Sequence, residues 1–322
     1  MPKKSLMYAM YEAINAEMAR DDKVIFQYEY QTPVSSFGEL PIINLEANYG
    51  FPRVAHSGIV ENWYGAVAVG AARVGLKTVA DIPTMAFPIV FHWLSTNCKM
   101  TYNTGGKETL PFVIIVEQPG QDAGAGIAHS DYEADSWLMH IPGLKTVVPS
   151  TAHDAKGLMT AAIRSPHPIA FILSMGLRAV IDEVPDEPYE VSIGEAAIRT
   201  EGSDITIVSS SHGMIPVLKA AKRLQDDGVG VEVIDLRTLN PMDTKAIVES
   251  VRKTKRLLTV DMTYYTLGPG AEVVARAAEA VPEAKFRRIA HPDAPGPGAP
   301  EMRLWLKPND ENIYKAAKKL LG

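Results

Sequence analysis

Short apolar runs alternate along the chain with stretches in which apolar residues recur at helical spacing. Such runs predict buried β-strands, and recurrence every three or four residues predicts helices packed against them. In the first half, the pattern predicts strands at 24–27, 77–81, 111–116, 145–148 and 168–173. The helices predicted around and between these strands span 6–18, 61–74, 87–97, 132–140 and 152–164. This alternation is typical of a parallel sheet that helices cover on both faces.

A change of composition divides the chain. Residues 181–190, IDEVPDEPYE, are acidic and contain two prolines, which is typical of a linker. Beyond them the alternation resumes, with strands predicted at 205–209, 231–235 and 257–261, and helices at 215–225, 243–253, 271–280 and 312–321. We therefore predict an α/β protein with a parallel-sheet domain at 1–182 and a smaller α/β domain at 191–322.

Composition narrows the class of protein. A length of 322 residues favours two domains, and 46% hydrophobic with 22% charged residues is typical of a globular protein. The net charge of −6, without a long basic run, argues against nucleic acid and membrane as partners. The one cysteine, Cys98, cannot form an internal disulfide, which favours the cytoplasm. No apolar run reaches membrane-helix length, and the start, MPKKSLMYAM, predicts mature protein rather than a signal peptide.

The first candidate for chemistry is Glu61. It opens a predicted helix in the segment 58–72, GIVENWYGAVAVGAA, whose later turns consist almost entirely of glycine, alanine and valine. Small side chains let a helix approach its neighbours closely, so we expect this helix to be central and dry. A carboxyl group at the end of such a helix is costly unless something binds it. The pattern therefore predicts a binding role for Glu61.

A second candidate is His129, which follows a strand and the glycine-rich segment 120–126. Open α/β folds place their sites at the carboxyl ends of strands, and imidazole suits proton transfer near neutral pH. The alternative is a structural histidine whose ring is hydrogen-bonded to carbonyl groups of the loop. Glu29, just after the first strand, fits a surface position as well as a site. The acidic residues near the next helix start are explained by the helix dipole: Asp131, Glu133 and Asp135.

Several stretches together carry a resemblance to a known family. They are the Glu61 helix, KMTYNTGG (99–106), GAGIAHS (124–130), HIPGLKTVVPSTAHDAKGLMTAAIR (140–164) and DLRTLNPMD (235–243). With them, nearly the whole chain resembles the beta subunit of thiamine-diphosphate-dependent 2-oxo acid dehydrogenases, the decarboxylating component of the pyruvate and branched-chain complexes. The resemblance implies a pyrimidine-binding domain followed by a transketolase-type C-terminal domain.

The resemblance also implies roles for individual residues. The family's glutamate at Glu61 hydrogen-bonds a ring nitrogen of the aminopyrimidine and promotes its imino tautomer, which removes the thiazolium proton. The family's histidine at His129 assists proton transfer and acyl handover at the substrate end. The residues implied to contact thiamine diphosphate are Glu29, Ile59, Glu61 and Met85.

One motif of the family is missing. The family binds the diphosphate and its Mg through a GDG motif followed by an asparagine, and no GDG occurs in this chain. The resemblance therefore implies that a separate alpha subunit carries the Mg ligands, and we assign none to this chain. The implied assembly is a heterotetramer of two alpha and two beta chains, active only at the interface, and a lipoyl acyltransferase is a possible further partner.

Departures from the family pattern leave the substrate open. Two bulky rings, Tyr28 and Tyr30, flank Glu29, and Ala128 replaces the glutamine before the family's histidine. The leading hypothesis is decarboxylation of a small-molecule 2-oxo acid, with the acyl group passed to a lipoyl carrier. The alternatives are a two-subunit carboligase or transketolase-like enzyme that uses an aldehyde or ketone as acceptor, and a noncatalytic scaffold. Retention of Glu61 and His129 argues against the scaffold.

Overall fold

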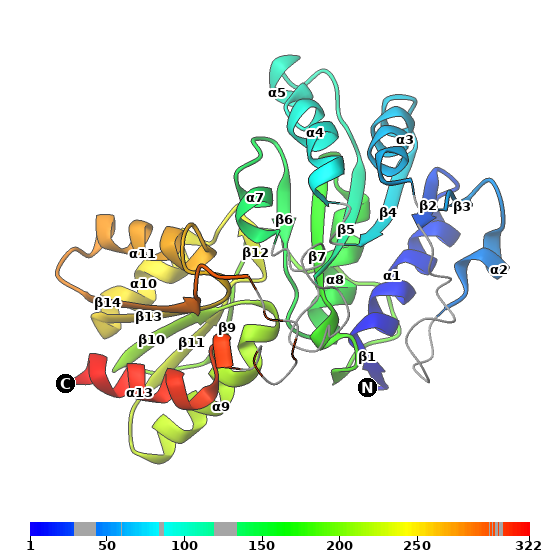
Figure 1. The fold of residues 1–322 in the computed structure, drawn as a ribbon. Helices are drawn as coiled ribbons and strands as arrows, with labels where there is room; N and C mark the ends of the chain where they lie inside the picture. Colours follow the sequence, from blue (N-terminus) through cyan, green and yellow to red (C-terminus); the bar gives the residue numbers. More distant parts are fainter. Residues whose placement is uncertain are drawn as a thin grey trace.

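A computed structural model of the 322-residue chain contains two α/β units, each built on its own sheet (Figure 1). It describes all residues except 29–42, 59, 84–86, 119–133, 296, 298, 300, 301, 303 and 304. Within the described ranges, no helix combines the length and the apolar character needed to cross a bilayer.

The larger sheet has seven strands in the order β12-β6-β7-β5-β4-β2-β3. Six of them run parallel: β2 (Val24–Tyr28), β3 (Val54–His56), β4 (Lys77–Pro83), β5 (Phe112–Gln118), β6 (Lys145–Val147) and β7 (Ile169–Ser174). All six therefore end at one edge, which we call the carboxyl edge. The seventh, β12 (Thr238–Asn240), comes from the second half of the sequence and pairs antiparallel with β6.

Helices cover both faces of this sheet, as the alternation predicts. Along β5, Val113 and Ile115 pack with α1 (Leu6–Arg20) and α8 (Ala152–Arg164). Ile114 and Val116 face the other way and pack with α3 (Glu61–Arg73), α4 (Phe87–Asn97) and α7 (Asp135–Met139). Side chains on both faces of the strand are buried, which explains why it is an uninterrupted apolar run.

The second sheet has five strands in the order β14-β13-β10-β11-β9. Four are parallel: β10 (Ile205–Ser209), β11 (Val231–Asp235), β13 (Arg256–Tyr264) and β14 (Lys285–His291), whereas β9 (Ala197–Thr200) is antiparallel. Helices α9 (Met214–Asp226) and α13 (Asp310–Leu321) contribute to the core on one face. Helices α10 (Thr244–Thr254) and α11 (Pro269–Ala280) cover the other face.

An ionic cluster with two buried aspartates joins the two halves. Arg199 on β9 forms ion pairs with Asp154 on α8 and with Asp235 at the end of β11. Ser150 Oγ also donates a hydrogen bond to Asp235, at 2.9 Å. Because Arg199 lies close by, the pKa of Asp154 falls below its ordinary value despite burial. These contacts fix the orientation of the second sheet relative to the first.

The predicted strands and helices that lie within the described residues are confirmed, with ends shifted by a few residues. Within the predicted linker, residues Ile181–Glu183 form strand β8, which pairs with β1 (Lys3–Ser5). The short elements without a clear pattern were missed: β1, α2 (Leu45–Tyr49), β3, α5 (Met100–Asn103), β8, β9, β12 and β14.

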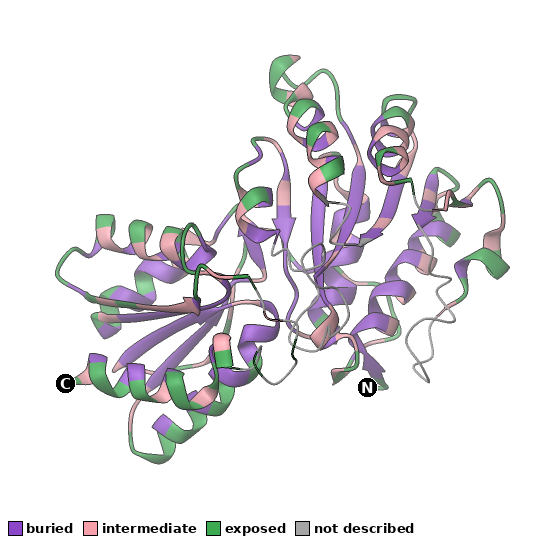
Figure 2. Ribbon diagram, viewed as in Figure 1, coloured by how far each residue is buried: buried purple, intermediate pink, exposed green. Residues whose placement is uncertain are grey.

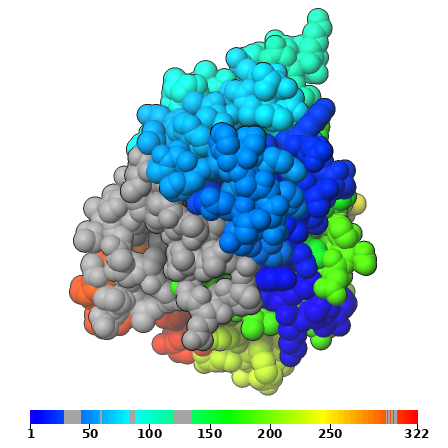
Figure 3. Space-filling view, turned by 90° about the vertical axis from the view of Figure 1, so that its right-hand side faces the viewer, coloured from blue at the N-terminus to red at the C-terminus, as the bar shows by residue number. Residues whose placement is uncertain are grey.

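The expectation that the Glu61 helix is central and dry is correct for one of its faces only. Tyr64, Gly65 and Ala68 are buried, whereas Asn62 and Gly70 are exposed. Figure 2 shows green and pink segments along α3 and α4. In the view of Figure 3, the blue and light-blue atoms of the region that includes α1, α2 and α3 lie directly beneath the cyan atoms of α4. In this single chain the small-residue helix thus presents an outer face to solvent.

Candidate active site

Four of the five predicted site residues come after strands, in the sequence, that are neighbours in the sheet. Strands β3, β2, β4 and β5 are adjacent in that order and end at His56, Tyr28, Pro83 and Gln118. The four residues, which lie outside the described part of the chain, follow these strand ends in the sequence: Ile59, Glu29, Met85 and His129. Open parallel sheets bind ligands outside the carboxyl ends of their strands. The sheet order thus places the described strand ends that precede these residues side by side at one edge.

Glu61, the fifth residue, is the first residue of α3 and is partly buried. No hydrogen bond or ion pair joins its carboxylate to any other described residue. Glu61 therefore presents an acceptor at the carboxyl edge that can take a hydrogen bond from outside the chain.

Packing below Glu61 fixes the start of α3. The hydroxyl of Tyr64, one turn into the helix, donates to the carbonyl oxygen of Gly58 at 3.1 Å, and Ser57 Oγ lies 2.9 Å from the same hydroxyl. Gly58 has φ of +72°, a conformation that L side chains rarely adopt. Further along, Gly65 lies so close to Trp93 on α4 that an added Cβ would be 2.8 Å from the ring. These contacts hold the Glu61 backbone at a defined position.

A polar cluster lies on the opposite face, at the ends of β2 and β4. Tyr11 of α1 donates a hydrogen bond to Asp81 Oδ2 at 2.9 Å, and burial raises the pKa of Asp81 to about 6 against the effect of this bond. Tyr28 donates to Glu46 Oε2 at 2.8 Å, and burial together with this bond raises the pKa of Tyr28 to about 12. The ring of Tyr28 also lies against His56. The residue before Glu29 is thereby held rigidly.

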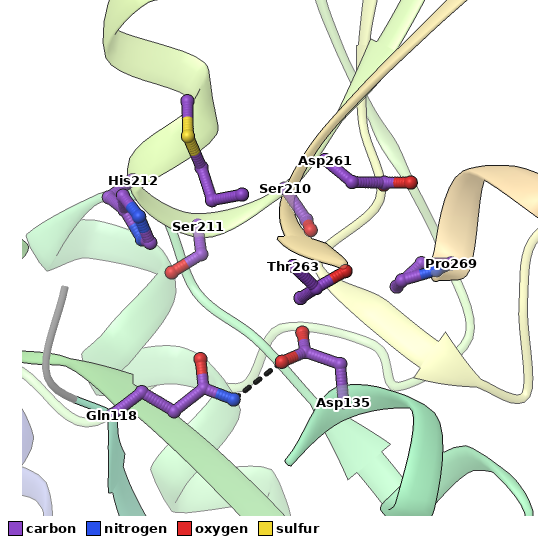
Figure 4. A pocket seen from close by; sticks show the side chains of 9 residues that line it. Gln118, Asp135, Ser210, Ser211, His212, Asp261, Thr263 and Pro269 are labelled. Carbon is purple, nitrogen blue, oxygen red and sulfur yellow. Dashed lines mark hydrogen bonds between the residues drawn. The ribbon is translucent and has the colours of Figure 1, made fainter. Parts of the chain in front are cut away.

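A pocket lies where the strand ends of the two sheets meet (Figure 4). Ser174, at the end of β7, is hydrogen-bonded through Oγ to Nδ1 of His212, just after β10, at 3.0 Å. Gln118 donates from Nε2 to Asp135 Oδ2 at 2.5 Å. Three buried atoms that line this pocket have no hydrogen-bond partner within the described protein: Ser211 Oγ, His212 Nε2 and Thr263 Oγ1.

Burial governs the charges in this pocket. It lowers the pKa of His212 to about 3, with a contribution from Lys307, so the ring is neutral at physiological pH. Burial also raises the pKa of Asp261 to about 7, despite hydrogen bonds from the Gly270 N–H at 2.9 and 3.1 Å. Asp135, which the helix dipole alone seemed to explain, belongs to this pocket. Sequence patterns gave no signal for His212 or Asp261.

Two family models together cover most of the chain. The transketolase pyrimidine-binding domain matches residues 3–178, and the transketolase C-terminal domain matches residues 194–313. The chain is 36% identical to the mitochondrial pyruvate dehydrogenase E1 component subunit beta-1 of Arabidopsis thaliana, covering 97% of this chain and 87% of that one. The chain belongs to the pyruvate dehydrogenase E1 beta family. This membership confirms the resemblance found in the sequence and its two-domain composition.

Further comparisons agree with this E1 beta assignment. The pyruvate dehydrogenase E1 beta subunit of Staphylococcus epidermidis is 34% identical over 100% of this chain and 99% of its own. Among solved structures, a split-gene transketolase described as an inactive beta4 tetramer superposes with a TM-score of 0.81 over 99% of this chain and 98% of its own. Its sequence identity of 22% supports a shared fold only. The family is one of thiamine-diphosphate-dependent enzymes, which argues against a noncatalytic scaffold.

Proposed function

We propose that this chain is the pyrimidine-binding subunit of a two-chain enzyme that decarboxylates a 2-oxo acid and passes the acyl group to a lipoyl carrier. The observation that carries the proposal is the Glu61 carboxylate, which has no partner among the described residues at the carboxyl edge of the sheet. Membership of the E1 beta family supports it, since the relatives are named as pyruvate dehydrogenase components.

The residues of the site suit an aminopyrimidine. Glu61 offers an acceptor at the carboxyl edge, and Glu29, Ile59 and Met85 belong to segments that follow neighbouring strands. When bound, thiamine diphosphate supplies the carbon nucleophile that attacks the 2-oxo carbonyl. Glu61 holds a proton between its carboxylate and a ring nitrogen, and α3 keeps this oxygen in place. We assign His129, at the substrate end, to proton transfer and acyl handover.

The diphosphate and Mg require a second chain. No GDG occurs in the sequence, and no group of three His, Cys, Asp or Glu suited to a metal is found among the described residues. We therefore assign the Mg ligands to an alpha subunit and propose a heterotetramer of two alpha and two beta chains. The exposed outer face of α3 leaves surface available for assembly. Sedimentation of the co-expressed chains tests this stoichiometry.

We further propose that the enzyme is cytoplasmic. Cys98 is the single cysteine and is buried, so the fold uses no disulfide of its own. Fractionation of cells expressing the untagged chain, with a periplasmic marker as reference, tests this location.

Substitution of Glu61 tests the catalytic proposal. The Glu61→Ala and Glu61→Gln variants, reconstituted with the alpha chain, should lose about 10²-fold or more in kcat, because proton transfer at this oxygen is removed. Glu272→Gln is the matched control: it also replaces a carboxylate in the first turn of a helix, α11, in the other half of the chain. Full activity of Glu61→Ala would contradict the proposal.

The acceptor is tested separately. The reconstituted enzyme is given pyruvate or a branched 2-oxo acid, with and without an isolated lipoyl domain. When the lipoyl domain is present, we expect its acylated form, detected by mass spectrometry. When the lipoyl domain is left out, we expect little product. A carboligation product formed from an added aldehyde in the absence of the lipoyl domain would identify the transketolase-like alternative instead.

A further inference from the structure

The pocket where the strand ends of the two sheets meet (Figure 4) lies at the switch point of the second sheet. Strand β10 has β11 on one side and β13 on the other, and all three run parallel. The helix after β10, α9, covers one face of the sheet, whereas the helix after β13, α11, covers the other. Chains that leave neighbouring strands toward opposite faces open a crevice at the carboxyl ends, where open α/β sheets bind ligands.

Three side chains of the second unit that line this pocket carry unpartnered polar atoms. They belong to Ser211 and His212, which follow β10, and to Thr263, near the end of β13. Each residue is less than a tenth exposed, and Ser211 Oγ, His212 Nε2 and Thr263 Oγ1 have no hydrogen-bond partner among the described residues. Buried polar atoms without a partner are costly, so three of them around one cavity indicate an occupant that hydrogen-bonds to them.

The backbone at Ser211 supports the same conclusion. Its φ is +51°, in the left-handed region that L side chains rarely adopt. Ser211 begins a short 3₁₀ helix, Ser211–Gly213, that leads directly into α9. A strained residue of this kind persists only where the surrounding structure fixes it, and such residues cluster at binding and active sites. The conformation fixes the position from which Ser211 Oγ meets the pocket.

The opposite wall of the pocket belongs to the first unit. Gln118 at the end of β5 and Asp135 at the start of α7 line it and are hydrogen-bonded to each other. Gln118 is paired in register with Ser174 of β7, whose hydroxyl is hydrogen-bonded to His212 Nδ1. In Figure 4 the Gln118 amide and the Asp135 carboxylate face the side chains of the second unit. An occupant of the pocket therefore has polar groups of both units around it.

A single water molecule is the occupant that suits these groups. The cavity has a volume of about 10 Å³, enough for one water and too small for an organic ligand. Hydroxyls and a neutral imidazole both donate and accept hydrogen bonds, as water does. An anion would be repelled by the Asp135 carboxylate. A metal ion would lack ligands, because the part of the chain that the structure describes holds no three His, Cys, Asp or Glu grouped as in a metal site.

We propose that an ordered water in this pocket hydrogen-bonds to Ser211, His212 and Thr263 of the second unit and to the Gln118–Asp135 pair of the first. This pair bounds, in the sequence, the segment that contains His129, which is assigned to proton transfer. His212 is then a positioning residue, which acts on turnover through the water and the pair without touching substrate. Only this last step rests on the proposed function.

A crystal structure of the full chain, at a resolution that shows ordered waters, tests the site itself. We expect one density peak within hydrogen-bond distance of Ser211 Oγ, His212 Nε2 and Thr263 Oγ1, and no anomalous signal there when thallium replaces potassium in the crystal. An anomalous thallium peak would identify a cation instead, and the absence of any peak would show that nothing binds. Either result overturns the inference.

Thr263→Val tests the site in solution. Loss of a hydroxyl that binds water should lower the Tm of the full chain by about 1–3 °C, whereas loss of a hydroxyl without any partner should raise the Tm or leave it unchanged. Thr259→Val is the matched control, because Thr259 lies on the same strand, is buried with an unpartnered hydroxyl and does not line the pocket. A Tm that does not fall for Thr263→Val, or that falls equally for Thr259→Val, would overturn the inference.

Two substitutions of His212 separate the roles of its ring nitrogens. The amide of asparagine can replace Nδ1 toward Ser174, and the longer glutamine can place its amide at the position of Nε2. In the complex with the alpha chain, His212→Asn should lower kcat about threefold or more and leave both KM and the Kd for thiamine diphosphate unchanged. His212→Gln should retain most of kcat, because it keeps a group for the water.

The outcomes separate the positioning role from the proposed function. A kcat that His212→Asn leaves unchanged, or that both variants lower equally, would overturn the positioning role of His212. A wild-type complex that decarboxylates no 2-oxo acid would overturn the proposed function, while the crystal structure and the Tm values would still decide whether the water is bound.

Discussion

Gln118 and Asp135 are joined by a hydrogen bond from Nε2 to Oδ2 at 2.5 Å, and both side chains are almost fully buried. Gln118 is the last residue of β5, and Asp135 is the first residue of α7. The bond therefore connects the two ends of the segment that contains His129. A bond to a carboxylate in a buried site is stronger than a neutral surface bond.

Breaking this bond should affect turnover more than cofactor binding. Gln118→Ala leaves the Asp135 carboxylate without this donor, which should cost about 1–3 kcal/mol of unfolding free energy. We expect a lower kcat in the reconstituted complex because the ends of the His129 segment are no longer tied, and an unchanged Kd for thiamine diphosphate. Steady-state kinetics and calorimetry give the two values.

Asp243→Ala is the control for lost stability. Asp243 caps α10 by accepting from the Ala246 N–H at 3.0 Å, and it also accepts from the Ala196 N–H at 3.0 Å, so its removal should cost at least about 1 kcal/mol. It should leave kcat unchanged. If both variants lower kcat alike at equal loss of stability, the Gln118–Asp135 bond has no specific part in turnover.

Asp261 should make the protein less stable as the pH rises from about 4 to about 7. Burial raises the pKa of Asp261 to about 7 in the folded state, whereas an unfolded aspartate titrates near about 4. Between these values the folded chain keeps a proton that the unfolded chain releases, so unfolding is favoured by rising pH. The slope from this group is at most about 1.4 kcal/mol per pH unit.

The Asp261→Asn variant isolates this contribution. Asparagine stays neutral and keeps an oxygen that can accept from the Gly270 N–H. The difference in unfolding free energy between variant and wild type, measured by urea denaturation, should therefore grow in favour of the variant from pH 4 to pH 7. A difference that stays constant over this range would show that the carboxyl group is ionised throughout.

Cys98 should be inert to alkylation in the folded chain. It directly follows the last residue of α4, its side chain is buried, and burial raises the pKa of the thiol to about 12. The thiolate, which is the reactive form, is therefore scarce at neutral pH. Iodoacetamide should modify the thiol only after denaturation, as followed by intact-mass spectrometry. Rapid modification under native conditions would contradict the observed burial.

The core of the fold could be predicted because buried parallel strands are apolar on both faces. The run at 112–116 packs against helices on each side, and its neighbours follow the same rule. The strand β12 could not be predicted in this way. Its three residues carry no period, and it exists because Thr238 pairs with Val147 of a strand about ninety residues earlier. Long-range pairing of this kind leaves no local signal.

The residues of the candidate site also differ in how well the sequence predicts them. Glu61 could be proposed from the sequence because a carboxyl group beside a small-residue helix is unusual. His212 was missed because the segment SSSHG does not show that its ring is buried and hydrogen-bonded to Ser174, thirty-eight residues earlier. Asp135 was attributed to the helix dipole, whereas its partner Gln118 lies seventeen residues away. Partners of buried polar groups follow from the packing of distant segments.

Two glycines of α3 should respond oppositely to alanine. At Gly65 an added Cβ would lie 2.8 Å from the ring of Trp93, so Gly65→Ala should force α3 and α4 apart and destabilise the chain by about 1–3 kcal/mol. At Gly70 no atom lies within 4 Å of the added Cβ, and the residue is exposed, so Gly70→Ala should stabilise the free chain by about 0.5–1 kcal/mol. Thermal unfolding of both variants measures the contrast.

The Gly70→Ala variant also tests whether another subunit covers the outer face of α3 in the assembly. The Gly70→Ala variant should be more stable alone, yet it should assemble more weakly with the alpha chain if another subunit packs closely against this face. Sedimentation of the co-expressed chains would detect the loss. Normal assembly of Gly70→Ala would place the contact between subunits elsewhere, and it would leave the small residues on the outer face of α3 without a packing role.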